Sequence, residues 1–208
     1  MFKSVIDVKS LVNLNDANLH SNPYLEKVKV SDQDFTETEL EDLSLDNVLL
    51  ESVTLNQVKI EDFKVVDSIF KKCNIAGAEI EKAYFTRFMT EGSRMQGVQL
   101  SQARVIDASF VSSKLNNVNL RYAKLKNVVF DSCDMASIDF IGAELKNVSF
   151  IKCDLSGASF SQAKLQSVDL AGSNITNISI EAEAIKEVFV DTGQAIYLSS
   201  IFGLKIRD

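Results

Sequence analysis

Residues 143–167 read AELKN-VSFIK-CDLSG-ASFSQ-AKLQS, which is five blocks of five residues. The third residue of every block is leucine or phenylalanine, and the first is alanine, valine or cysteine. The other three positions hold mostly charged, amide or hydroxyl side chains. This stretch therefore carries two apolar side chains in every five residues.

The same five-residue period runs along most of the chain. Positions divisible by five from Leu25 to Ile180 are apolar in thirty-one of thirty-two cases, and the exception is Thr90. Positions two residues earlier, from Leu43 to Ile178, hold only apolar residues or serine. This spacing fits neither the roughly 3.6-residue period of a helix nor the alternation of a strand. It predicts a coil that turns a corner every five residues.

Side chains twenty residues apart also match in size. Stacked coils need such matching, because voids between the layers are costly. One set is aromatic except for a threonine and a final leucine, a second set is alanine, and a third holds only cysteine and serine: Phe70, Thr90, Phe110, Phe130, Phe150 and Leu170; Ala83, Ala103, Ala123, Ala143 and Ala163; Cys73, Ser93, Ser113, Cys133, Cys153 and Ser173.

Segments such as residues 143–147, 153–157 and 163–167 resemble the A-(D/N)-L-x-x repeat of the pentapeptide-repeat family, and the resemblance covers roughly residues 25–180. It implies an all-β solenoid, a right-handed quadrilateral β-helix with four pentapeptides in each coil. We expect residues 1–24 to form an N-terminal cap and a first coil that is out of phase, with a loop or bulge at residues 20–24. At Thr90, where an inward position becomes polar without loss of phase, we expect a local bulge near Gly92.

The repeat stops after Ile180, and residues 181–208 are predicted to form a C-terminal cap with a short helix. Asp191 or Thr192 can be its N-cap and Gly203 can follow its C-terminus. The expected apolar face of this helix consists of Ala195, Leu198, Ile201 and Phe202. The resemblance implies a homodimer through Tyr197, Ile201, Phe202 and Leu204. The alternative is a monomeric cap that uses the same residues.

Composition and charge exclude several classes of protein. One proline and eight glycines in 208 residues argue against disorder and collagen, and no apolar run reaches the ~18 residues of a membrane span. The net charge of −7 disfavours direct nucleic-acid binding. Charges within residues 1–9 argue against a secretory signal, and three cysteines without C-x-x-C spacing fit a reducing compartment. We therefore expect a cytoplasmic protein.

No pattern in the sequence indicates catalysis, a cofactor or a metal. His20 is the only histidine, so no second histidine can share a metal ion with it. The cysteines fall in one inward column, which favours small core residues over a redox or zinc site. Nucleophile-elbow, phosphate-loop, zinc-protease and EF-hand motifs are missing. The sequence therefore predicts that the chain is not an enzyme.

Acidic residues gather near the N-terminal end, where residues 31–62 hold ten acids and one base. Coils of twenty residues would stack like charges about 5 Å apart, which destabilises a sheet. Such a ladder could imitate the phosphate rows of a duplex, or it could serve only solubility and edge protection. Its members are Glu41, Glu61 and Glu81, with Asp42 and Asp62 beside them.

The resemblance implies two kinds of non-catalytic function. One is a protein-binding scaffold, favoured by outward apolar residues Ile106, Val111, Ile141 and Ile151. The other follows family members that mimic DNA, bind DNA gyrase or topoisomerase IV and give quinolone resistance. Two features depart from those members: the coils of residues 63–180 are not acidic, and the unbroken phase leaves no room for projecting loops.

Overall fold

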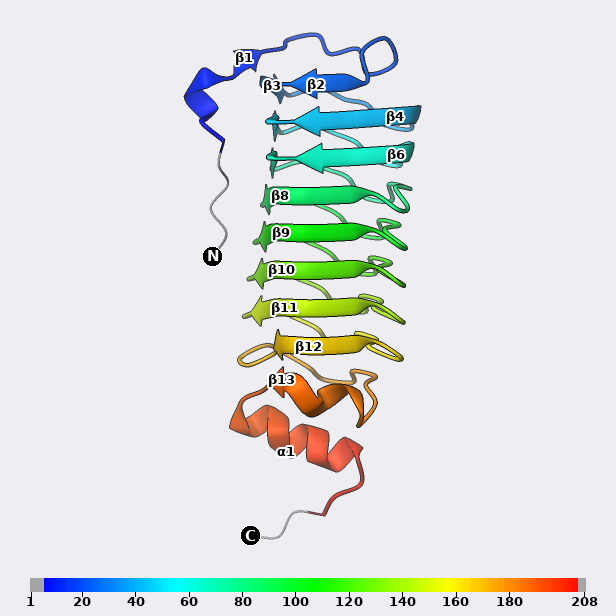
Figure 1. Cartoon of the computed structure of the whole chain (residues 1–208), viewed down its shortest axis with the longest axis vertical. Coiled ribbons are helices and arrows are strands. Elements are labelled where there is room, and N and C mark those ends of the chain that lie inside the picture. The colour runs from blue at the N-terminus through cyan, green and yellow to red at the C-terminus, as the bar shows by residue number, and fades with distance from the viewer. Residues whose placement is uncertain (1–5, 206–208) are drawn as a thin grey trace.

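The computed structural model describes residues 6–205 and shows a rod, a parallel β-solenoid with one α-helix at its C-terminal end (Figure 1). The long strands β4, β6 and β8–β12 stack one above another along the rod, and α1 lies across its C-terminal end. The elements are η1 (Val8–Ser10), β1 (Val12–Asn13), β2 (Tyr24–Glu26), β3 (Val28–Ser31), β4 (Glu39–Asp46), β5 (Leu49–Glu51), β6 (Lys59–Val66), β7 (Ile69–Lys71), β8 (Tyr84–Glu91), β9 (Arg104–Val111), β10 (Lys124–Asp131), β11 (Glu144–Ile151), β12 (Lys164–Asp169), η2 (Ala184–Glu187), β13 (Val188–Phe189) and α1 (Thr192–Ile201).

Neighbouring coils pair in parallel with a register of twenty residues. Leu125 in β10 lies beside Leu145 in β11, and the same step continues to Leu165 in β12. Within one coil a left-handed φ occurs at four residues, Asp107, Ser112, Asn117 and Tyr122. Four such corners in twenty residues make the coil quadrilateral, as the resemblance implied.

The interior of the rod is filled by the two inward positions of each five-residue block. Every position divisible by five from Leu25 to Ile180 is buried except Phe35, which is half-buried. Aromatic rings stack along the axis: the ring centroids of Phe110 and Phe130 lie 4.7 Å apart, and those of Phe130 and Phe150 lie 5.1 Å apart. The predicted core is confirmed.

The predicted bulge near Gly92 is wrong. β8 pairs with β9 in register on both sides of Thr90, and Gly92 has the left-handed φ of an ordinary corner, +61°. The volume that a ring at position 90 would occupy is filled by Phe88, whose centroid lies 5.0 Å from that of Phe70 and 5.9 Å from that of Phe110. The aromatic stack therefore passes through a neighbouring column and the backbone stays regular.

The first coil is shorter than the others. Val12 in β1 pairs with Val28 in β3, a step of 28 − 12 = 16 residues, whereas Lys29 pairs with Leu49 at the usual twenty. A deficit of four residues is equivalent to one extra residue in a period of five, which accounts for the phase shift seen in the sequence. Ala17 and Leu19 are buried over the open end of the core.

The C-terminal end of the core is closed by α1. Asp191 caps the helix: its carboxylate accepts from the backbone N–H of Gln194, whose side chain accepts from the N–H of Asp191. Gln194 is buried and donates to the carbonyls of Leu170 and Ser173 at 2.6 and 2.8 Å. Leu198 is the buried apolar residue of this helix, whereas Ala195 and Ile201, which the sequence placed on the packing face, are exposed.

Candidate functional site

One corner of the rod differs between its two halves. In the later coils the residue that enters the long strand is alanine, and its N–H donates to the carbonyl three residues earlier. This turn bond, 2.9–3.4 Å long, closes a tight corner in five successive coils, at Ala83, Ala103, Ala123, Ala143 and Ala163.

In the two preceding coils the same position holds Leu43 or Phe63, both buried. There the long strands begin earlier and run unbroken through the corner, with Leu40 beside Ile60 and Leu43 beside Phe63. Asp42 and Asp62 also lack the left-handed φ that Lys82 and Gln102 adopt at the equivalent place. A large inward side chain needs more room than alanine, so we attribute the open corner to these two residues.

Four carboxylates are displayed on this open corner, and we call Glu41, Asp42, Glu61 and Asp62 the acidic corner. Asp42 and Asp62 are register partners on β4 and β6, so their Cα atoms lie roughly 4.8 Å apart. All four side chains are exposed, and none makes an ion pair with another residue of the range 6–205. Like charges in direct opposition destabilise a sheet, and among the described residues no ion pair relieves them.

Glu81 stands apart from these four residues. Between β6 and the next coil the pairing includes Lys59 with Glu79 and resumes only at Lys64 with Tyr84. Glu61 and Glu81 are therefore twenty residues apart without being register partners. The open corner ends here, where the chain changes to the tight alanine corner.

Two open depressions flank the acidic corner. One, of about 500 Å³, lies at the step between the open and tight corners, and the other, of about 320 Å³, lies toward the N-terminal loop. The first is lined by four acids together with the cations Lys59 and Lys82, and the second by residues that include His20, Pro23, Glu41 and Asp42.

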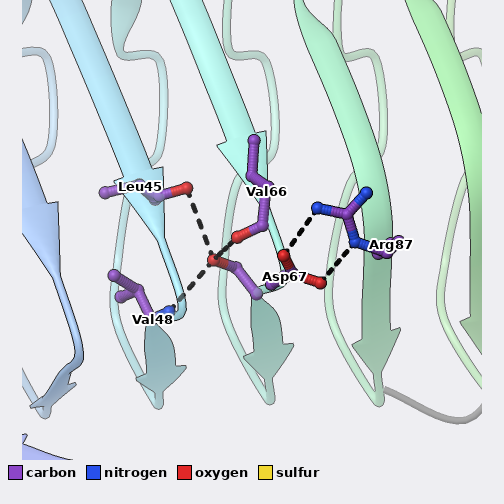
Figure 2. Close-up of polar contacts among 6 residues, drawn as sticks. Leu45, Val48, Val66, Asp67 and Arg87 are labelled. Carbon is purple, nitrogen blue, oxygen red and sulfur yellow. Dashed lines mark hydrogen bonds and ion pairs between the residues drawn. The ribbon is translucent and has the colours of Figure 1, made fainter. Parts of the chain in front are cut away.

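Polar contacts on the next corner around the same coils stabilise the rod (Figure 2). The buried Ser68 hydroxyl accepts from the N–H of Val48 at 3.1 Å and donates to the carbonyl of Val66 at 2.7 Å. Beside it, the Arg87 guanidinium donates two hydrogen bonds of 2.6 Å to the Asp67 carboxylate. These groups pair with each other, whereas the four carboxylates of the acidic corner have no ion-pair partner within residues 6–205.

The three cysteines are buried, whereas the histidine is exposed. Cys73, Cys133 and Cys153 are buried free thiols, and burial raises the pKa of Cys73 to about 11. The hydrogen bond with the Cys153 side chain, together with burial, raises the pKa of Cys133. His20 is exposed on its loop. Within residues 6–205, no group of three or more metal-ligating side chains is brought together.

Outward apolar side chains lie at the N-terminal end, on the sheet faces and on the C-terminal cap. Of the four that the sequence singled out on the sheet faces, Ile106, Val111 and Ile141 are half-buried, and Ile151 is 43% exposed. Of the predicted cap residues, Tyr197 and Phe202 are half-buried, and the Tyr197 hydroxyl accepts from the N–H of Asn177. Leu198 is buried, and four large apolar side chains of the cap are exposed, of which the sequence analysis missed the first two: Phe189, Ile196, Ile201 and Leu204.

Two models of known protein families match the region in which these corners repeat. A family model described as a pentapeptide repeat region matches residues 83–150, and a model of eight pentapeptide copies matches residues 143–179. The chain belongs to the pentapeptide-repeat family. No curated protein matches the sequence significantly. No described helix of this pentapeptide-repeat protein is long and apolar enough to cross a membrane.

Several solved structures are similar to this pentapeptide-repeat protein. Full-length QnrB1, a plasmid-mediated fluoroquinolone resistance protein, is 16% identical over 85% of this chain and 100% of its own, with a TM-score of 0.40. Rfr23 from the cyanobacterium Cyanothece 51142 is 20% identical over 57% of this chain and 88% of its own, with a TM-score of 0.41. HetL from the cyanobacterium Nostoc sp. strain PCC 7120, involved in heterocyst differentiation regulation, is 16% identical over 80% and 86%, with a TM-score of 0.36.

Proposed function

We propose that the chain is a non-catalytic protein-binding module whose contact surface is the acidic corner. The observation that carries this proposal is the pairing of Asp42 with Asp62 in register, next to Glu41 and Glu61, with no ion pair to any of the four within residues 6–205. A partner that supplies lysine or arginine side chains would relieve this repulsion on binding. Charge complementarity of this kind speeds encounter and selects among partners.

Rigidity supports the same function. Residues of the acidic corner stand on β4 and β6, whose strands pair along their length and whose inward side chains are buried. Charges on such a scaffold lose little conformational freedom when a partner binds, which favours affinity.

A capture experiment tests the proposal against the alternative that the apolar faces make the contact. The protein is immobilised as wild type, as Glu41→Gln/Asp42→Asn/Glu61→Gln/Asp62→Asn, and as Ile141→Lys/Ile151→Lys. We expect specific partners, identified by quantitative mass spectrometry, to be lost with the first variant and kept with the second. Loss with the second variant alone would assign binding to the apolar face and contradict the proposal.

A second candidate function is a DNA-mimicking modulator of a type II topoisomerase. The same observation favours it, because stacked carboxylates about 5 Å apart resemble the charge spacing along a duplex, about one per 1.7 Å of axis for both strands, more closely than scattered acids do. The test is ATP-dependent supercoiling by DNA gyrase, titrated with wild type and with Asp42→Lys/Glu61→Lys/Asp62→Lys. A control, Glu91→Lys/Glu183→Lys/Glu187→Lys, makes the same change of charge elsewhere. Inhibition by the wild type and the control, but not by the lysine variant of the acidic corner, supports this function. Equal inhibition by all three proteins, or inhibition by none of them, contradicts it.

The exposed apolar residues of the cap support a third element of the proposal, a homodimer through the C-terminus. Ile201 is 41% exposed and Leu204 is 65% exposed, close to Phe189 and Ile196 in sequence. We expect Ile201→Asp/Leu204→Asp to abolish this dimer while α1 keeps its capping box. Chemical cross-linking between the caps of two copies, with thermal unfolding as a check of the fold, would show it, and cap-to-cap cross-links that survive the substitution would contradict this arrangement.

A further inference from the structure

One outward row of the solenoid has an ordered sequence of charge. The row lies on the face formed by β2, β4, β6 and β8–β11, and each residue is the register partner of the next, twenty positions on. We call it the central row, and from the N-terminal end it reads Glu26, Asp46, Val66, Thr86, Ile106, Lys126 and Lys146, after which the register continues to the uncharged Gln166 in β12.

The order is two acids, three residues without charge, and two bases. Lys126 and Lys146 are exposed and lie directly opposite each other, and neither makes an ion pair among the described residues. Asp46 likewise has no ion-pair partner within residues 6–205, whereas Glu26 forms an ion pair of 2.9 Å with Lys27. Val66 and Ile106 are half-buried, and Thr86, which lies between them in the row, is buried.

When the row is read in the reverse direction, each acid stands where a base stood and each base where an acid stood. If a second copy packs against this face in the antiparallel direction, a two-fold axis through Thr86 sets each row against the same row of the other copy. Glu26 then faces Lys146, Asp46 faces Lys126, and Val66 faces Ile106. The six steps between the ends span roughly 29 Å at ~4.8 Å per step.

We propose that this face is an isologous interface between two antiparallel copies of the chain. A two-fold interface requires a self-complementary patch, and the central row supplies one with apolar residues in the middle and opposite charges at both ends. The interface uses neither the acidic corner nor the C-terminal cap, so it goes beyond the proposed function. Its charged ends are exposed, and salt therefore weakens it.

The experiment uses charge reversal in the full chain. All proteins carry Ile201→Asp/Leu204→Asp, which removes any association through the cap. One variant adds Lys126→Glu/Lys146→Glu, and another adds Glu26→Lys/Asp46→Lys. In each variant both ends of the interface bring like charges together, whereas an equimolar mixture of the two variants restores opposite charges at both ends.

Sedimentation velocity and native mass spectrometry give the outcome. We expect a dimer for the unreversed chain, dimer dissociation constants raised at least about tenfold in each variant alone, and a heterodimer in the mixture. A matched control, Lys72→Glu/Lys152→Glu, makes the same change of charge on an exposed corner away from the row and should keep the dimer. A monomeric unreversed chain, dimers that survive either reversal, or a mixture that stays monomeric would each overturn the proposal.

Discussion

The coils that carry Leu43 and Phe63 differ from the five coils that follow them at one corner. In the later coils an alanine closes the corner with a turn bond, and in the earlier coils a large buried side chain leaves it open. The open corner carries four unpaired carboxylates, whereas the tight corners carry mixed and largely uncharged residues. One inward side chain thus accompanies a change in both the shape and the charge of the surface outside it.

The largest expected effect comes from removing the inward ring of the open corner. Phe63→Ala should lower the free energy of unfolding by about 3–5 kcal/mol, because Phe63 is buried and packs edge-on against Phe85 at 5.6 Å. Urea denaturation measures it. In the same variant, hydrogen exchange at the amide of residue 63 should slow toward that of Ala103 if the corner closes. Unchanged exchange would show that side-chain size does not open the corner.

The converse change tests a tight corner. Ala123→Leu should destabilise the protein by about 1–3 kcal/mol, since the interior there is filled and the turn bond to the Leu120 carbonyl must lengthen. Thermal unfolding compares it with Ala136→Leu, at an outward position. Equal stability of the two variants would show that a tight corner accepts a large inward side chain, and would contradict the distinction between open and tight corners.

A smaller effect concerns the charges themselves. Asp62→Asn should stabilise the protein by about 0.2–1 kcal/mol at low salt, because it removes the repulsion with Asp42. Asp32→Asn is the control, since Asp32 is an exposed acid at a left-handed corner. Added salt should erase the gain. A loss of stability at position 62 but not at 32 would show that the acid has a structural role.

The smallest expected effect lies in the alanine-cornered coils, where charges are paired. Hydrogen bonds from Lys164 and Lys124 lower the pKa of Glu144. Because the pKa is lowered in the folded state, the contribution of these ion pairs to the stability of the fold is present near neutral pH and is lost as the pH falls through that pKa. Glu144→Gln should therefore cost a few tenths of a kcal/mol at pH 7, in the range of exposed pairs, and nothing well below the usual glutamate pKa of ~4.3. A cost that persists in acid would show that packing, and not charge, explains it.

Much of the fold was accessible from the sequence, because the five-residue period states which side chains point inward. The bulge at Thr90 was predicted wrongly because Phe88 supplies the missing volume from a neighbouring column, a compensation visible only in three dimensions. The twenty-residue step predicted that Asp42 and Asp62 would be neighbours, but it also grouped Glu81 with them. The signal that separates Glu81 was present in the sequence, as the change from Leu43 and Phe63 to Ala83.

The measurement that tests the central claim most directly is a hydrogen-exchange footprint of the complex with a captured partner. Free and bound protein are compared segment by segment. The account predicts that protection on binding is concentrated in residues 39–46 and 59–66, which carry the acidic corner, and that raised salt removes it. Protection confined to β9–β11 or to α1, with residues 39–66 unchanged, would contradict it.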